Sequence, residues 1–183
     1  MINLPILYFG YLIILFSIIG FGYLSSKLLS IRLSLGELGI SGILFMTILS
    51  YITNLFVSHG FIHNSIFLVI GLFAFFFILK KKLFRKNIKL VLLVSSVLFI
   101  GILMYKTHDD FFYYHLPYTI SLIEFKKIFG VGNLEHGFRT PSSIFYLNSL
   151  FYLPILEKSL INSGAIYFLI FSNIFLIQKY LTN

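Results

Sequence analysis

Long apolar stretches without charge dominate this sequence, and they limit it to the folds that a lipid bilayer admits. Residues 1–26 contain no charged side chain, and further apolar stretches follow along the 183-residue chain. A membrane-spanning helix needs roughly 20 apolar residues, and its backbone polar groups must be bonded within the segment. Only 11% of the residues are charged, against about 25% in soluble proteins. We therefore expect an all-α fold, a polytopic transmembrane helix bundle.

About six spans are predicted from these stretches. They cover residues 4–24, 38–58, 64–79, 90–105, 143–156 and 160–177. The first has no Lys or Arg ahead of its apolar core, which argues for a retained helix rather than a cleaved signal peptide. We divide the chain into residues 1–89, three helices with a basic connection, and residues 90–183, which include a large loop at 106–142 and two further spans.

The basic residues predict the orientation. Lys27 and Arg32 follow the first span, and six Lys or Arg residues lie within residues 80–89. Short cytoplasmic loops are enriched in Lys and Arg, so we expect the N-terminus and the 106–142 loop outside a bacterial cytoplasmic (inner) membrane. The net charge of +8 then reflects topology and attraction to anionic membrane lipids, and no nucleic-acid partner is expected. The absence of cysteine excludes disulfide and thiolate sites.

The 106–142 loop is where chemistry is expected, because it holds four of the six acidic residues. Asp109 and Asp110 follow the fourth span directly, where a carboxylate can accept a proton from a hydroxyl or amine. The alternative is that they only cap the next helix. Arg139 lies where the chain returns to the membrane, and its guanidinium can bind a phosphate through two hydrogen bonds. The alternative for Arg139 is an interfacial anchor.

An amphipathic pattern follows the two aspartates. Within residues 111–128, one stripe at spacings of three and four consists of Phe111, Tyr114, Tyr118, Leu122 and Phe125. This pattern predicts an interfacial helix lying on the membrane, with Pro117 in its first turns. A helix packed under other spans is the alternative.

Metal ligation stays open. His108, Asp109, Asp110, His115 and His136 carry enough nitrogen and oxygen donors for a divalent metal, yet their spacing matches no standard zinc signature. His59 and His63 flank Gly60 and are interpreted as loop residues.

The Asp-Asp pair, the Tyr and His after it, and the segment RTPSSIFYLNSLFYLP that enters the next span resemble the GT-C superfamily of polytopic membrane glycosyltransferases. The chain is most similar to the protein mannosyltransferases and the aminoarabinose transferase of lipid A. In that superfamily an acidic pair opens the first large external loop, and a proline-containing segment begins the next helix. Asp109, Asp110 and Pro141 match these positions.

The resemblance implies transfer of a sugar from a polyprenyl-phosphate donor to an acceptor on the outer face, with inversion at the anomeric carbon. It implies that Asp109 is the general base and that Asp110 orients the acceptor or binds a metal. Substrate contacts are implied for four residues: Lys106, Tyr114, His115 and Arg139, of which Arg139 or Lys106 would contact the donor phosphate.

The resemblance covers roughly residues 90–177. In the superfamily the acidic motif usually follows the first transmembrane helix, whereas here it follows the fourth predicted span, so three extra spans precede it. We therefore expect the N-terminal part of a larger enzyme, with the remaining C-terminal part as a partner. The alternative function is a non-catalytic integral membrane subunit or transporter fragment whose external loop binds another protein.

Overall fold

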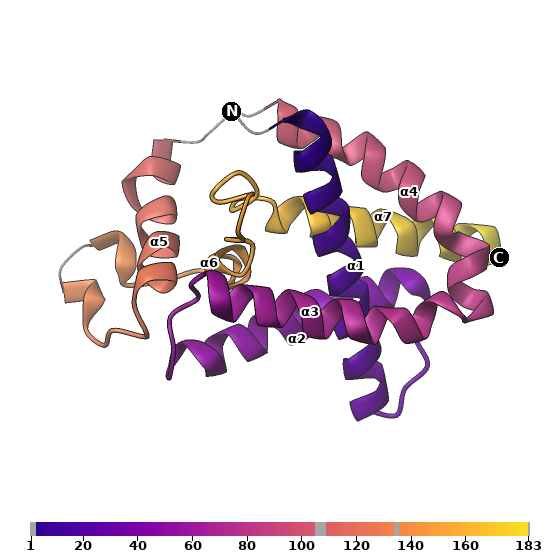
Figure 1. The fold of residues 1–183 in the computed structure, drawn as a ribbon, viewed down its shortest axis with the longest axis horizontal. Coiled ribbons are helices and arrows are strands. Elements are labelled where there is room, and N and C mark those ends of the chain that lie inside the picture. Colours follow the sequence, from indigo (N-terminus) through magenta and orange to yellow (C-terminus); the bar gives the residue numbers. More distant parts are fainter. Residues whose placement is uncertain (1–2, 105–108, 134–135, 183) are drawn as a thin grey trace.

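The computed structural model describes residues 3–104, 109–133 and 136–182 (Figure 1). These residues form helices and turns, with one isolated β-bridge between Leu153 and Glu157 and no strand. The α-helices are α1 (Leu4–Leu28), α2 (Leu35–Asn54), α3 (Phe61–Leu79), α4 (Lys82–Leu103), α5 (Leu116–Glu124), α6 (Ser143–Ser149) and α7 (Gly164–Thr182). A π-helix, η1 (Phe111–His115), directly precedes α5, and two short 3-10 helices follow it, η2 (Val131–Asn133) and η3 (His136–Phe138).

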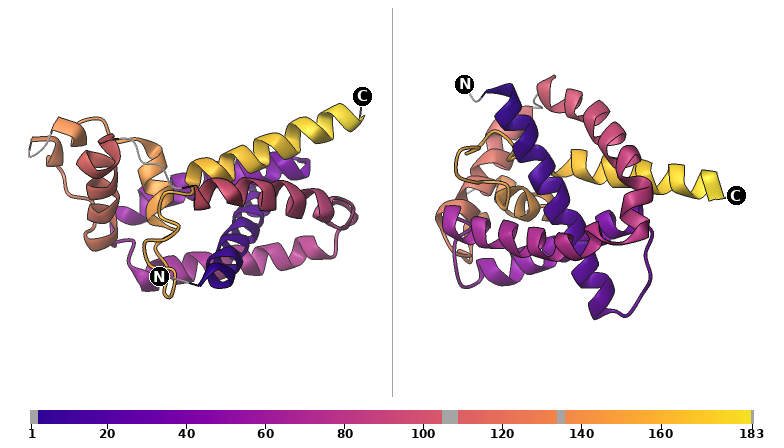
Figure 2. Two further views of the ribbon diagram at one scale, coloured as in Figure 1. Left: turned by 90° about the horizontal axis from the view of Figure 1, so that it is seen from above. Right: turned by 45° about the vertical axis from the view of Figure 1, so that its right-hand side comes forward.

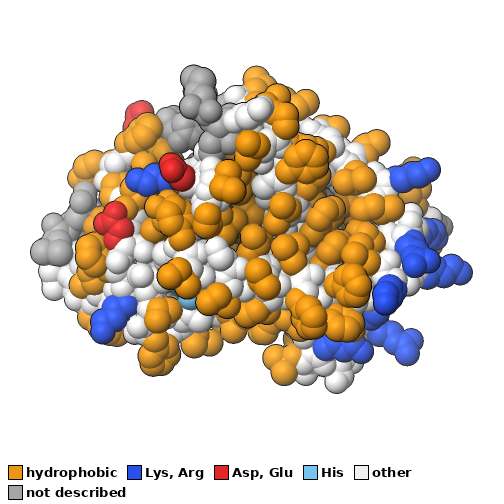
Figure 3. Space-filling view, viewed as in Figure 1, with side chains coloured by type: hydrophobic (Ala, Val, Ile, Leu, Met, Phe, Trp, Pro, Cys, Tyr) orange, Lys and Arg blue, Asp and Glu red, His pale blue; other side chains and the backbone are white. Residues whose placement is uncertain are grey.

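Five of the described helices, α1 to α4 and α7, are long and apolar enough to cross a membrane. This is compatible with an integral membrane protein. Much of the surface is apolar (Figure 3); on α3, for example, Ile62 is 81% exposed and Phe73 is 67% exposed. Exposed apolar side chains of this kind are more favourable in contact with lipid tails than in contact with water.

The two ends of the helix bundle differ in charge. We call the end formed by the α1–α2 and α3–α4 connections the basic end, because it carries Lys27, Arg32 and the six cations of residues 80–89. The loop end comprises the α2–α3 connection and the described residues between α4 and α7. On the face shown in Figure 3, cationic side chains gather at one extreme and the visible carboxylates lie toward the other.

Local sequence sets the tight α1–α2 connection. The Ile31 N–H bonds to the Ser26 carbonyl at 3.0 Å and the Ser30 N–H to the Lys27 carbonyl at 3.2 Å, which ends α1 in a Schellman motif. Ser34 then caps α2, where its hydroxyl and the Glu37 carboxylate each accept a backbone N–H of the other residue.

Glycines allow α1 to cross its neighbours closely. In Figures 1 and 2, α1 passes across α3 at a steep angle. A Cβ on Gly20 would collide with the Gly71 carbonyl of α3, and one on Gly42 of α2 would collide with the Ile18 carbonyl of α1. Small residues at crossings are typical of helices that pack within membranes. Lipid provides no hydrophobic effect between helices, so close packing of their backbones drives the association instead.

Tyrosine hydroxyls bond the helices to one another within the apolar core. The Tyr11 hydroxyl of α1 donates to the Ser95 carbonyl of α4 at 2.9 Å, and the Tyr167 hydroxyl of α7 donates to the Tyr11 carbonyl at 3.0 Å. The rings of Tyr11 and Tyr167 also stack, with their centroids 5.2 Å apart. These bonds connect α4 and α7, which lie side by side (Figure 2), to α1.

Helices at the predicted spans 4–24, 38–58, 64–79 and 160–177 are confirmed, with ends shifted by a few residues. The helix α4 begins at Lys82 rather than at residue 90, so the basic segment is part of the helix. Long Lys and Arg side chains can extend away from an apolar surface, and a cationic sequence therefore does not end a helix.

The predicted continuous span at 143–156 is wrong. The helix α6 ends at Ser149, and residues 150–163 form turns in which Ile155 and Glu157 have φ of 71° and 44°. Leu150, Phe151 and Leu153 of this segment are buried among the helices. An apolar run shorter than about 17 residues is more typical of buried or re-entrant chain than of a crossing, and non-helical backbone is tolerated where protein surrounds it.

Candidate functional site

One helical segment at the loop end carries most of the predicted site residues. Asp109 and Asp110 are helical, η1 continues the segment, and α5 ends it. In η1 the Leu116 N–H bonds to the Phe111 carbonyl, five residues earlier rather than four. Pro117 comes next, and because its ring crowds the carbonyl four residues before it, a widened turn is the expected accommodation. Short π segments inside helices often mark functional sites.

The two aspartates lie in the first described turn of this segment. Asp109 is exposed and Asp110 is partly exposed. Asp110 has helical torsion angles, φ −62° and ψ −19°, whereas an N-cap residue adopts an extended conformation. Asp110 is therefore not the N-cap residue of η1.

Tyr114 and His115 lie on η1 and are half-buried. The two rings are perpendicular with centroids 4.4 Å apart, and the His115 ring lies 4.9 Å from the ring of Phe145 on α6. The Thr119 hydroxyl donates to the His115 carbonyl at 2.8 Å. Both predicted residues thus attach the aspartate-bearing helix to α6.

Arg139 is exposed at the end of η3, where its Nε donates to the Gly132 carbonyl at 3.2 Å. It forms no ion pair with a carboxylate in the part of the chain that the structure describes. Tyr114 packs against Gly137, two residues before Arg139, with no space for a Cβ at that glycine. The structure therefore brings η1 and the Arg139 loop together. Lys106 lies outside the described residues.

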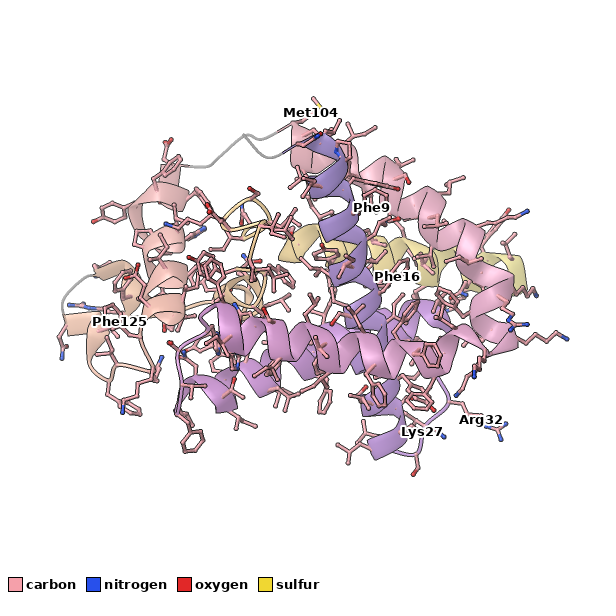
Figure 4. All side chains as sticks on the ribbon, viewed as in Figure 1. Phe9, Phe16, Lys27, Arg32, Met104 and Phe125 are labelled. Carbon is pink, nitrogen blue, oxygen red and sulfur yellow. The ribbon has the colours of Figure 1, made fainter. Side chains whose placement is uncertain are left out.

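The predicted amphipathic stripe faces the protein along most of its length. Phe111, Tyr118 and Leu122 are 6%, 2% and 3% exposed, and Tyr118 and Leu122 pack with Tyr146 of α6. Phe125, labelled in Figure 4, lies beyond α5 and is 52% exposed. Most of the stripe is therefore buried against the protein, and the interfacial position of the helix stays a prediction.

A metal site gains no geometric support within residues 3–104, 109–133 and 136–182, where no group of three His, Asp or Glu side chains could hold an ion. Of the predicted donors, Asp109, Asp110, His115 and His136 are in this part. His108 lies outside the described residues.

A second polar cluster, not evident from the sequence pattern, lies inside the loop end. We call Asn54, His59, Asn64 and Ser149 the polar junction; all four are 0% exposed. The Asn64 amide donates to the carbonyls of His59, Ser149 and Tyr152 at 2.7, 2.8 and 2.9 Å. Asn64 thereby connects the α2–α3 connection, α3 and the end of α6.

His59 and Ser149 form a close pair in this junction, with Nδ1 and Oγ 2.7 Å apart. Because the Ser149 hydroxyl donates to the Tyr146 carbonyl at 2.8 Å, the shared proton belongs to His59 Nδ1. Burial and the stacked His63 ring lower the pKa of His59 to about 3. The two bonds hold the Ser149 side chain between the His59 ring and the Tyr146 carbonyl.

Lys127 fixes the chain after α5 in a similar way. Its ammonium group donates to the hydroxyls of Tyr146 and Tyr118 at 2.6 and 3.0 Å, and its backbone N–H donates to the Asn54 carbonyl at 2.7 Å. Burial and the bond with Tyr118 raise the pKa of the Tyr146 phenol. The loop end is therefore a rigid support for the aspartate-bearing helix.

A weak sequence signal of the polar junction exists. Asn64 and Ser149 interrupt apolar stretches, where polar side chains usually find a partner. His59 does lie in a connection, as predicted, but its complete burial depends on α6, which is distant in sequence. The prediction of His63 as a loop residue is wrong, because α3 begins at Phe61 and includes it.

Comparison with known proteins yields a family without an assigned activity. No curated protein and no solved structure is significantly similar to the chain. Residues 4–183 match the family described as Domain of unknown function (DUF8201). Because this match includes the five long helices and the whole loop end, the chain belongs to the DUF8201 family.

Proposed function

We propose that this chain is a multi-pass protein of the bacterial cytoplasmic (inner) membrane, with its N-terminus outside. Five crossings by α1 to α4 and α7 then put the basic end inside and the loop end outside. The concentration of Lys and Arg at one end supports this orientation, because translocated loops are poor in these residues. The helix α6 and the turns after it enter the bundle without crossing it.

The proposed activity is transfer of a sugar from a polyprenyl-phosphate donor to an acceptor at the outer face, as in the GT-C superfamily that the sequence resembles. The observation that carries it is the helical segment after α4, in which Asp109 and Asp110 precede a π turn bearing Tyr114 and His115. The exposed carboxylate of Asp109 lies in the segment that follows a candidate span, where a donor held in the same membrane can reach it.

In this mechanism Asp109 accepts the proton of the acceptor hydroxyl while the acceptor oxygen forms a bond to the anomeric carbon. The bond between that carbon and the phosphate oxygen breaks, and its electron pair leaves with the polyprenyl phosphate, so the configuration inverts. Asp110 orients the acceptor or holds a divalent cation. Arg139 or Lys106 contacts the phosphate, and Tyr114 and His115 contribute to substrate binding.

The interfacial position of this helix is also part of the proposal. Phe112 and Tyr113 are 62% and 63% exposed and follow the aspartates directly. Aromatic side chains are favoured at the level of lipid headgroups. These two residues, rather than the predicted stripe, would hold the active carboxylates at the membrane surface.

Sugar transfer in membranes that contain the full-length protein tests the activity. With a radiolabelled polyprenyl-phosphate sugar as donor, Asp109→Asn should reduce transfer about 100-fold or more, the usual contribution of a general base. Glu124→Gln is the matched control, because Glu124 is an exposed carboxylate at the other end of the same segment. If Asp109→Asn and Asp110→Asn both retain full transfer, the mechanism is wrong.

A non-catalytic subunit is the second candidate, and it is favoured by exposed apolar side chains after α5. Ile128 and Phe129 are 45% and 82% exposed in a loop at the same end, as a surface for another membrane protein would be. Cross-linking from this loop in intact membranes separates the two candidates. The subunit function would be supported by two results: one cross-linked partner that is lost in Phe129→Ser, and no sugar transfer by the unaltered protein.

A further inference from the structure

A cavity of about 560 Å³ lies at the basic end, between the last turns of α1, the α1–α2 connection and the α3–α4 turn. Lys27, Arg32 and Lys81 line it, and none of the described lining residues is acidic. Lys27 and Arg32 are labelled in Figure 4, at the end of α1. Three cations without a carboxylate make the cavity attractive to an anion.

One aromatic ring holds two of these cations. The Nζ atoms of Lys81 and Lys27 lie 4.3 and 5.7 Å from the centroid of the Tyr23 ring. A cation–π contact leaves the ammonium N–H groups available to an acceptor. In the part of the chain that the structure describes, neither lysine nor Arg32 forms an ion pair. The like charges are therefore brought together without a counterion from the protein.

The backbone at the mouth of the cavity is also unusual. Ser30, which lines the cavity, has φ of +54° at the position of the Schellman motif where glycine is preferred. A non-glycine residue in this conformation is strained, because its Cβ crowds the backbone. The hydroxyl of this serine adds a hydrogen-bond donor beside the cations.

The rest of the lining is apolar and includes Leu33, Leu38, Ile78 and Leu83. Leu28 and Leu29, on the adjacent surface, are 73% and 62% exposed. The cavity volume is within the range of roughly 300–1,000 Å³ found for small-molecule sites. An inorganic phosphate would contact only the cations, whereas a ligand with an anionic head and hydrocarbon chains would also cover these apolar groups.

We propose that this cavity binds the phosphate group of an anionic membrane phospholipid. The phosphate lies among Lys27, Arg32 and Lys81, and the acyl chains follow the apolar wall toward Leu28 and Leu29. Polybasic segments attract anionic lipids diffusely; this site is distinct because it selects one lipid at one position. It is independent of the sugar-transfer proposal, which concerns the opposite end of the bundle.

Native mass spectrometry of the full chain tests the proposal, after release from nanodiscs of phosphatidylcholine with a minor fraction of phosphatidylglycerol. We expect a single retained phosphatidylglycerol on the unaltered protein. The double variant Lys27→Gln/Lys81→Gln should retain about 30-fold less, because each basic residue near anionic lipid usually contributes about fivefold to binding. Arg85→Gln/Lys89→Gln removes the same charge from the same end without altering residues that line the cavity, and should retain as much as the unaltered protein.

Equal losses in the two double variants would show diffuse attraction and overturn the proposal. Inorganic phosphate serves as a soluble competitor, and displacement of the lipid by millimolar phosphate would show a phosphate site that does not need acyl chains. Thermal unfolding of both variants in pure phosphatidylcholine nanodiscs establishes that they fold. Because all four substituted cations are exposed, both variants should unfold close to the temperature of the unaltered protein.

Discussion

The polar junction at the loop end is buried and held by hydrogen bonds to neighbouring backbone and side chains, whereas the cations that line the cavity at the basic end are exposed and form no ion pair among the described residues. Asn64 and Ser149 are 0% exposed and fully engaged in hydrogen bonds. Lys27 and Lys81 are exposed, and their ammonium groups lie over the face of the Tyr23 ring. Burial makes the first set costly to disturb, while solvent makes the second set cheap to change.

This difference separates two uses of polarity in an apolar chain. At the loop end, hydrogen bonds fix non-helical backbone and hold the helix that bears Asp109. At the basic end, the Lys and Arg side chains remain available to attract anionic lipids and to determine the topology. Each prediction below therefore compares substitutions at, or between, these two ends.

The largest effect on stability is expected for Asn64→Leu. It leaves three carbonyl groups without their amide donor, which should lower the free energy of unfolding by about 3 kcal/mol. Unfolding in mixed micelles measures this. Asn173→Leu is the control, since the Asn173 amide is exposed and bonds only the Leu169 carbonyl of its own helix. Equal losses in both variants would mean that the polar junction adds no stability.

Hydropathy locates most of the fold because lipid requires long apolar helices, so α1, α2, α3 and α7 follow from the sequence. Hydropathy fails at residues 143–156, where the apolar residues form a short helix and buried turns instead of crossing the membrane. The distinction depends on Asn64, which bonds the Ser149 carbonyl from 85 residues away in the sequence. Periodicity within one segment contains no information about such a partner.

A smaller effect is expected from acid, through His59. Its pKa of about 3 in the folded protein is below the ordinary value of 6.5, so protonation favours the unfolded state. Stability should be complete above pH 6.5 and fall as the pH decreases toward 3, by about 2 kcal/mol at pH 5. The variant His59→Gln should lose this slope, while His136→Gln, at an exposed histidine of the same end, should keep it. A slope unchanged in His59→Gln would contradict the burial of a neutral imidazole.

Lys127→Met should have a milder effect, because Lys127 is only partly buried. Loss of its bonds to Tyr118 and Tyr146 is expected to cost about 1 kcal/mol of unfolding free energy. The neighbouring Lys126 is exposed, and Lys126→Met should be neutral in the same measurement. An equal loss in both would assign the effect to charge and not to the tyrosine contacts.

The smallest effect is expected at the basic end. Arg85→Gln/Lys89→Gln removes two exposed cations and should change the free energy of unfolding by less than about 0.5 kcal/mol. The same unfolding assay provides the measurement. A loss as large as that of Asn64→Leu would remove the contrast between the two ends.

The candidate site could be predicted only in part. The position of Asp109 and Asp110 after a span follows from hydropathy and charge, because both are visible in the sequence. The roles of Tyr114 and His115 as contacts to α6 do not, because Phe145 meets them only after the loop has folded back. The π turn before Pro117 likewise depends on backbone geometry that residue types alone do not specify.

The placement of the two ends on opposite sides of a membrane is the central claim, and single-cysteine labelling tests it most directly. The chain has no cysteine, so Asn133→Cys at the loop end and Lys86→Cys at the basic end each provide one thiol at an exposed position. In intact cells, a membrane-impermeant maleimide should label Asn133→Cys at once and Lys86→Cys only after permeabilisation. Labelling of Lys86→Cys in intact cells, with Asn133→Cys protected, would contradict the orientation and the outer-face activity built on it.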